Sequence, residues 1–428
     1  MEETAPVGAV GHRLALQRKL AGLTQQQLAA RAHVSVSLIS QVERGVVPAS
    51  PAFTAAVARG LGIEVEALYA QPCGAGITNP RADHAGVPAL RAALDCADDP
   101  VLSGPPMAPV ELRIKLDECE RDRARSRYAQ MAVALPELLQ HAYVLAADAR
   151  AGVESETAWS LLADAYMLAQ TVSFRFGQLD LATQSNDRWR SAAGRSGDPL
   201  RGATAAYQRG ALRLFRGDYV GVLRLMERAH SQIAAERSPT ADSVRVQLHL
   251  RQAIAHARSG TADRADEHIT AARALIARGI PANPYYDVIA TATNVDLHWV
   301  SVPVELTDGT TAVGRVGQVR NPEQDEPSRA GRYWIDVARA WTLHGGRTQA
   351  LDALNQARRI APQLTRYHPQ VPRDCSPARR NRPPRHRLLG RVRPLDRREA
   401  LISPNAVGAV VVEFLRVERY RRGHTKDA

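Results

Sequence analysis

The side chains that could act as nucleophiles or metal ligands are scattered along the 428 residues of this chain. The four cysteines form no CxxC pair, which argues against a zinc ribbon and a disulfide framework and favours reduced thiols. His249 and His256 lie two turns apart on one predicted helix, too distant to share a small ion readily. No nucleophile elbow, P-loop or HExxH motif is present. We therefore expect a binding protein rather than an enzyme, with no metal and no other cofactor. The cysteines are Cys73, Cys96, Cys119 and Cys375.

Short polar side chains that can form hydrogen bonds are concentrated in the stretch LTQQQLAARAHVSVSLISQVERG, which begins at Leu23. Its first residues can cap a helix, because Thr24 is followed three residues later by Gln27, as in a capping box. After a break at AHVS, a second helix is predicted whose Ile39 and Val42 face an apolar core. Two helices of about two turns each are not stable alone in water, so neighbouring elements must hold them.

Amphipathic stretches on both sides of this pair can supply those elements. Upstream, VGHRLALQRKLAG predicts a helix with Leu14 and Leu20 facing inward. Downstream, SPAFTAAVARGLG combines a Ser N-cap, a Pro at the first helical position and Gly62 as a left-handed C-cap. A further short helix ends near Tyr69. Residues 1–72 are thus predicted to form five short helices around one core.

Residues 11–70 resemble the phage-repressor-type helix-turn-helix family of transcriptional regulators, often called the XRE family. The matching residues are LTQQQLA, Ile39 and Val42, ERG at Glu43–Gly45 and LG at Leu61–Gly62. In that family the second helix of the pair enters the major groove of DNA, and the first helix crosses the backbone. The resemblance implies a lambda-repressor-like, five-helix bundle that binds double-stranded DNA.

The resemblance also assigns roles, matched residue by residue. Ser and Gln side chains can hydrogen-bond base edges and Val can pack on a thymine methyl, while a helix N-terminus favours phosphate. The implied base contacts are Val36, Ser37, Ser40 and Gln41, and the implied phosphate contacts are Thr24 and Gln25. The alternative is that these are solvated positions on a small bundle. The same match pairs Arg18 of the first helix with Glu43 at the end of the recognition helix.

One position departs from the family pattern. His33 occupies the turn, where the family usually has Gly. A residue other than Gly in the left-handed conformation costs about 1–2 kcal/mol. We therefore expect either a strained turn or a turn of another conformation, and a surface histidine rather than a pH sensor.

The net charge of +12 is not evenly distributed along the chain. Residues 1–72 hold six basic and five acidic side chains, a net +1, whereas residues 371–428 hold fifteen basic and six acidic, a net +9. The positive net charge of the chain therefore gives no evidence that the N-terminal domain binds DNA. Lysine is rare, with three residues, and arginine abundant, which indicates a GC-rich bacterial genome. The family resemblance implies a regulator of actinobacterial type.

Residues 73–125 are predicted to be a Pro- and Gly-rich linker around one short helix, and residues 126–370 a helical repeat domain. Five glycines each lie between two amphipathic stretches in the repeat domain. In most units a small residue follows the glycine by five positions. In three units an Ala or Gly also precedes the glycine by seven positions, and an Ala follows it by twelve. The glycines are Gly177, Gly217, Gly260, Gly309 and Gly345. The units at Gly177 and Gly309 are degenerate, with Trp189 and Asn321 where Ala is expected.

This pattern is similar to the tetratricopeptide repeat, although spacings of 36 to 49 residues imply longer turns than usual. The similarity implies an α-solenoid with a concave groove. Asn294, in ATATNVDLHW, falls on an inner helix of a repeat, where its amide could clamp a peptide backbone. A solvated groove residue is the alternative.

The whole chain is predicted to be all-α. We expect a transcription regulator whose N-terminal domain, residues 1–72, is a DNA-binding headpiece. The protein should bind a palindromic operator as a homodimer, since one headpiece buries too little surface for tight binding. The repeat domain would bind a peptide or protein partner. No segment spans a membrane and no signal peptide is seen, which favours the cytoplasm and the nucleoid. The alternative is a helical-repeat scaffold or antitoxin-like adaptor whose headpiece no longer reads DNA. The near-neutral headpiece slightly favours this alternative, and the intact capping and the ERG motif favour DNA binding.

The last segment, residues 371–428, lacks a helical period. PRDCSPARRNRPPRHRLLGRVRPLDRR contains five prolines and ten arginines in twenty-seven residues. It is either a basic arm that adds nonspecific phosphate contacts or a frame-shifted reading of GC-rich DNA, and we favour the frame shift. In both cases we expect disorder.

Overall fold

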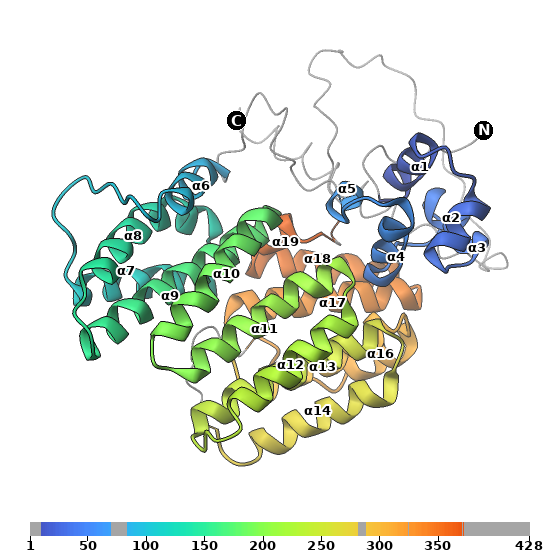
Figure 1. Cartoon of the computed structure of the whole chain (residues 1–428). Helices are drawn as coiled ribbons and strands as arrows, with labels where there is room; N and C mark the ends of the chain where they lie inside the picture. Colours follow the sequence, from blue (N-terminus) through green and yellow to red (C-terminus); the bar gives the residue numbers. More distant parts are fainter. Residues whose placement is uncertain (1–9, 70–83, 281–287, 324, 370, 372–428) are drawn as a thin grey trace, which may run out of the picture.

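The computed structural model describes residues 10–69, 84–280, 288–323, 325–369 and 371. Across these ranges the chain forms nineteen α-helices and no strand, which confirms the all-α prediction (Figure 1). Cys73, Cys375 and the basic segment after Val371 lie outside the described residues, so the expected disorder of that segment stays a prediction.

The first five helices form a small bundle, which we call the headpiece. They are α1 (Val10–Leu20), α2 (Gln25–Ala32), α3 (Val36–Glu43), α4 (Pro51–Leu61) and α5 (Glu66–Tyr69). Thr24 and Gln27 form the predicted capping box, with distances of 3.1 Å and 2.8 Å between the paired atoms. The hydroxyls of Ser35 and Ser50 cap α3 and α4 by accepting the backbone N–H groups of Leu38 and Phe53.

The headpiece buries one apolar core, and one predicted core residue is not part of it. Leu14, Leu28 and Ile39 are fully buried, but the side chain of Leu20 is 72% exposed. The prediction for Leu20 was wrong because six residues separate it from Leu14, which places the two about 120° apart around a helix.

Two further helices lead into the large domain, α6 (Val87–Asp95) and α7 (Pro109–Ala124). Helices then follow one another as antiparallel neighbours packed in series. They are α8 (Tyr128–Asp148), α9 (Val153–Arg175), α10 (Leu179–Arg195), α11 (Pro199–Arg216), α12 (Tyr219–Gln232), α13 (Pro239–Arg258), α14 (Ala262–Ile276), α15 (Ala292–Glu305), α16 (Gly309–Val316), α17 (Pro327–His344), α18 (Arg347–Ile360) and α19 (Pro362–Tyr367).

Four of the five predicted turn glycines lie between paired helices, with φ values from 74° to 92°. They are Gly177, Gly217, Gly260 and Gly345. The fifth assignment was wrong, since Gly309 begins α16 and the left-handed turn residue is Thr307, with φ 62°. A glycine search could not find it, because a threonine takes the strained conformation there. Five residues after Thr307 stands Ala312, which is fully buried like Ala182, Val222, Ala265 and Ala350 in the other units.

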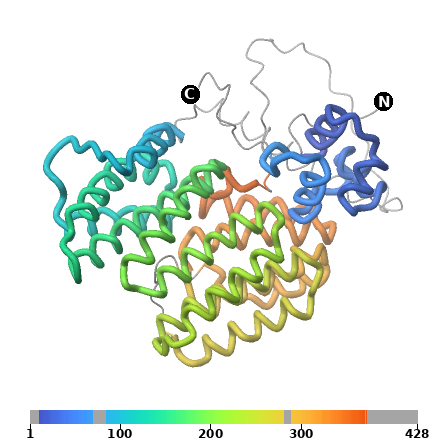
Figure 2. The backbone as a smooth tube through the Cα atoms, viewed as in Figure 1, coloured from blue at the N-terminus to red at the C-terminus, as the bar shows by residue number. Residues whose placement is uncertain are grey.

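The series of helices curves until its end meets its beginning (Figure 2). Leu364 and Tyr367 of α19 share a core with Phe176, the residue that follows α9. The Tyr367 and Phe176 rings lie 5.0 Å apart, centroid to centroid. Arg123 of α7 pairs with Glu326 ahead of α17 at 2.9 Å. The helices α9, α11, α13, α15 and α17 therefore surround a central cavity.

The headpiece contacts this ring at the turn after α11. The Tyr69 ring lies 5.4 Å from the Phe215 ring, centroid to centroid, and Arg59 donates to the carbonyl of Gly217 at 3.3 Å. A Cβ at Gly217 would lie only 2.5 Å from Cβ of Ala55. The two parts are thus closely apposed, and α3 lies on the side of the headpiece away from α11 (Figure 1).

Candidate functional site

The recognition helix α3 is oriented by its apolar residues. Ile39 and Val42 are 0% and 2% exposed and anchor one face in the headpiece core. The opposite face carries the four residues that the family resemblance assigns to base contacts. Val36 and Ser37 are exposed, whereas Ser40 and Gln41 are half-buried. The Gln41 amide donates to the Ser37 hydroxyl at 3.4 Å, so the hydrogen bond holds these two polar side chains next to each other on the helix surface.

The start of α2 holds the two residues assigned to phosphate. Thr24 is exposed and its hydroxyl accepts the backbone N–H of Gln27. The Gln25 side chain donates to Glu43 Oε2 at 2.7 Å. One of its two amide N–H donors is therefore engaged within the chain. A phosphate contact by Gln25 would use the other amide N–H or the backbone N–H at the helix start, which has no partner within the helix.

Arg18 and Glu43 connect α1 to the end of α3. Arg18 donates to both Glu43 oxygens, at 2.6 Å and 2.9 Å, and to the Leu23 carbonyl at 2.8 Å. The two side chains are 11% and 7% exposed. The hydrogen bonds with Glu43 raise the pKa of Arg18 above its ordinary value. The pair is thus largely buried and fixes the recognition helix against the first helix.

The turn between α2 and α3 adopts the strained alternative. His33 has φ 54° and ψ 43°, in the left-handed region, and its N–H donates to the Ala29 carbonyl. Sequence reasoning missed one cation here. Arg44 directly follows α3, is exposed, and donates to the Ser40 carbonyl at 3.3 Å. Its place in the ERG motif was the available signal, since a cation beside a recognition helix can contact phosphate.

The central cavity has a volume of about 220 Å³ and a strongly basic lining. Six guanidinium groups and two carboxylates border it. The arginines are Arg123, Arg175, Arg251, Arg258, Arg329 and Arg332, and the acids are Glu305 and Asp336. Two headpiece residues, Pro51 and Tyr69, also line it.

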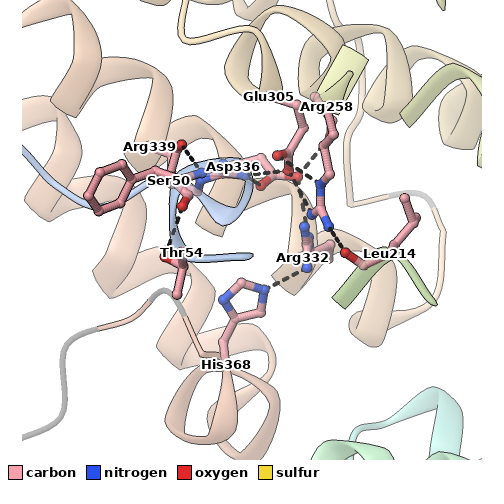
Figure 3. Close-up of polar contacts among 11 residues, drawn as sticks. Ser50, Thr54, Leu214, Arg258, Glu305, Arg332, Asp336, Arg339 and His368 are labelled. Atoms are coloured by element: carbon pink, nitrogen blue, oxygen red, sulfur yellow. Dashed lines mark hydrogen bonds and ion pairs between the residues drawn. The ribbon is translucent and has the colours of Figure 1, made fainter. Parts of the chain in front are cut away.

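A buried ion network ties the inner helices together around this cavity (Figure 3). Glu305 of α15 accepts from Arg258 of α13, at 3.0 Å and 3.1 Å, and from Arg339 of α17 at 3.0 Å. The Arg339 guanidinium also donates to Asp336 at 2.8 Å. Asp336 accepts from Arg332 at 3.3 Å, and Arg332 donates to His368 at 2.6 Å.

The network sets the charge state of its carboxylates. Burial alone would raise the pKa of Glu305, but Arg258 and Arg339 lower it to about 2. Against the same burial, Arg332 and Arg339 lower the pKa of Asp336 to about 2. Burial and the adjacent Arg332 lower the pKa of His368 well below its ordinary value, so its imidazole is neutral and accepts the hydrogen bond. Both acids are therefore ionised near neutral pH.

Asn294 lines the same cavity, and one of its two amide N–H donors is already used. The side chain is fully buried, and Nδ2 donates to the Ile289 carbonyl at 2.7 Å. Oδ1 has no partner among the described residues. The amide thus fixes the segment that precedes α15, and its role as a peptide clamp stays a prediction.

His249 and His256 are joined by two further histidines. His249 Nδ1 lies 3.0 Å from Nδ1 of His268, and the His230 and His249 rings lie 4.6 Å apart, centroid to centroid. Burial lowers the pKa of His249 to about 3 and that of His268 to about 4. Within the described ranges no three His, Cys, Asp or Glu side chains are arranged to hold a metal ion. Nor is any described helix long and apolar enough to cross a bilayer.

Comparison with known proteins supports the assignment of the headpiece. A family model described as a helix-turn-helix domain matches residues 9–70. The comparison with curated proteins found no match. Among solved structures, the crystal structure of BtubC (BKLC) from P. vanneervenii is similar, with 14% identity over 66% of this chain and 99% of that chain. Its TM-score of 0.29 is too low to carry an argument about the large domain.

Proposed function

We propose that the chain is a sequence-specific, DNA-binding transcription regulator of the XRE type. The single observation that carries this proposal is the α2–α3 pair, in which α3 is capped, buries its Ile39 and Val42 face and presents Ser37 and Gln41 on the opposite face. The helix-turn-helix match over residues 9–70 supports it. In this proposal Val36, Ser37, Ser40 and Gln41 contact bases, while Thr24, Gln25 and Arg44 contact phosphate. The protein acts as a homodimer on a palindromic operator, because one headpiece buries too little surface for tight specific binding.

We further propose that the large domain is a tetratricopeptide-like solenoid that controls the headpiece by binding a peptide or protein partner. The support is the position of Tyr69, which lines the cavity and packs on Phe215 of α11. A ligand in the cavity would contact both parts and favour one headpiece arrangement over another. By linkage, DNA would change the affinity for the ligand by the same factor. The protein acts by binding and not as an enzyme.

A DNA selection with the full chain tests the headpiece proposal. The chain should enrich one sequence motif from genomic fragments. Ser37→Ala with Gln41→Ala should weaken binding by about 1–3 kcal/mol per lost base contact and relax the motif at those positions. The matched control is Ser259→Ala with Gln318→Ala, which removes the same groups from exposed positions outside the headpiece. An unchanged motif in the first variant would contradict the docking.

One observation favours a second function, a protein-interaction adaptor. The recognition helix carries no basic side chain, and one of the two Gln25 amide N–H donors is held by Glu43. If no DNA fragment is enriched by the folded full chain at low salt, the adaptor is the better account.

A further inference from the structure

Arg251 of α13 is an unusual residue in the central cavity. Its guanidinium lies 4.1 Å above the centroid of the Tyr207 ring, and it contacts an aromatic face rather than a carboxylate. Its Nε–H has no hydrogen-bond partner among the described residues. Gly210 leaves room for this side chain, since a Cβ there would lie 3.2 Å from Arg251 Cγ. A buried N–H donor without a partner has a substantial desolvation cost.

Two of the neighbouring cations already have counterions. Arg258 pairs with Glu305 at 3.0 Å, and Arg332 pairs with Asp336 at 3.3 Å. Burial, together with the charges of Arg329, Arg258 and Arg332, lowers the pKa of Arg251. The electrostatic potential at Arg251 is therefore positive, and the two carboxylates that line the cavity are engaged elsewhere.

The walls around this charge are partly apolar. Ile254 lies one turn along α13 from Arg251, and Leu297 and Tyr333 line the cavity from α15 and α17. His298 is held in one orientation by a 2.8 Å contact between Nδ1 and the Asn294 carbonyl. A ligand that fits such a site combines one anionic group with an apolar or aromatic body.

We propose that the cavity binds an organic carboxylate whose charged group pairs with Arg251 and whose apolar body packs between α13 and α15. This inference rests on the proposed control function and names the chemistry of its ligand. A carboxylate can form two parallel, charge-assisted hydrogen bonds with a guanidinium, which would satisfy the Arg251 donors. The carboxylate belongs either to a small organic acid or to the C-terminus of a peptide.

The test is titration of the full chain, without DNA, by two pairs of probes. The first pair is 2-naphthoate and its neutral isostere 2-naphthamide. The second pair is the peptide acetyl-Ala-Ala-Phe with a free C-terminal carboxylate and the same peptide with a C-terminal amide. At least one carboxylate probe should bind one-to-one, about tenfold or more tightly than its neutral partner. The pair that shows this preference identifies the source of the carboxylate.

Variants locate the binding. Arg251→Met should weaken the carboxylate probe by about tenfold or more and leave the neutral probe unchanged, and Arg251→Lys should retain part of the preference. The control Arg264→Met removes an arginine that is 66% exposed on the outer helix α14 and should behave like the parent chain. Circular dichroism checks that each variant is folded.

Three results would overturn the inference. They are equal binding of charged and neutral probes, a folded Arg251→Met chain that binds carboxylates like the parent, and no saturable binding of either carboxylate at millimolar concentration. Because DNA is absent, none of these results bears on whether the headpiece reads DNA. Conversely, a headpiece that fails to select DNA leaves the anion titration interpretable.

Discussion

Arg18 and Glu43 form a bidentate ion pair that joins the first helix of the headpiece to the end of its recognition helix, with N–O distances of 2.6 Å and 2.9 Å. Glu43 also accepts from Gln25 at 2.7 Å, so one carboxylate connects three helices. The orientation of α3 therefore depends on a largely buried side chain at its C-terminal end.

A double-mutant cycle with Arg18→Met and Glu43→Gln should give a clear coupling energy. An exposed pair contributes about 1 kcal/mol or less, and removal of one partner from a fully buried pair costs about 3–5 kcal/mol. With side chains 11% and 7% exposed, each single substitution should cost toward the upper value, and the coupling energy should exceed the value of about 1 kcal/mol for an exposed pair. The exposed pair Arg264 and Glu267 serves as control. A coupling near zero in urea unfolding would contradict the buried role.

The left-handed turn at His33 should be improved by glycine. His33→Gly removes the clash of Cβ at φ 54°, while the more flexible unfolded chain offsets part of the gain. We expect the free energy of unfolding to rise by about 0.5–1 kcal/mol. His33→Val should lower it, because a β-branched residue is poorly tolerated at positive φ. If Gly destabilises the chain, the turn is not strained.

Replacement of Glu305 by Gln should destabilise the large domain strongly. The change leaves Arg258 and Arg339 buried around a neutral amide, at a cost of about 3–5 kcal/mol. The control is Asp296→Asn, whose partner Arg273 is 45% exposed and which should change stability by about 0.5 kcal/mol or less. Chemical denaturation measures both. Equal effects of the two variants would show that the network is not a stabilising element.

Acid should destabilise the protein in two stages. The folded-state pKa values of His249 and His268, about 3 and 4, lie below the unfolded value of 6.5, so the unfolded chain binds more protons as the pH falls. The stability that these neutral histidines contribute is present above about pH 6.5 and is lost toward pH 4. Glu305 and Asp336, with pKa values of about 2, extend the loss from about pH 4.5 to 2.

A histidine variant isolates the first stage. His249→Gln cannot take up the proton, so its thermal midpoint should fall less between pH 7 and pH 5 than that of the parent chain. His12→Gln, at an exposed position on α1, is the control. The same pH dependence in all three proteins would contradict the assignment.

The helices and their ends could be predicted from the sequence, because they depend on interactions between residues that are close along the chain. Caps such as Thr24 and Ser50 and the small residues at fixed distances from turn glycines are local signals, and the helices follow them. The central cavity could not be predicted from the sequence. Arg251 resembles a surface arginine in the sequence, and only the packing of α11 and α15 around it shows that it lines a cavity. Asn294 does line the cavity, but the sequence could not show that its amide donates to the Ile289 carbonyl.

Closure of the helical series into a ring has a consequence for folding. In an open array each repeat contacts only its neighbours, so stability is nearly a sum of local terms and the ends can unfold separately. Here Arg123 contacts Glu326, 203 residues later in the chain. Such long-range contacts slow folding, because a large loop must close before they form. They also make the stability of the first helices depend on the last. We therefore expect the closed domain to unfold in a single transition, and deletion of one internal helix pair to destabilise the whole domain.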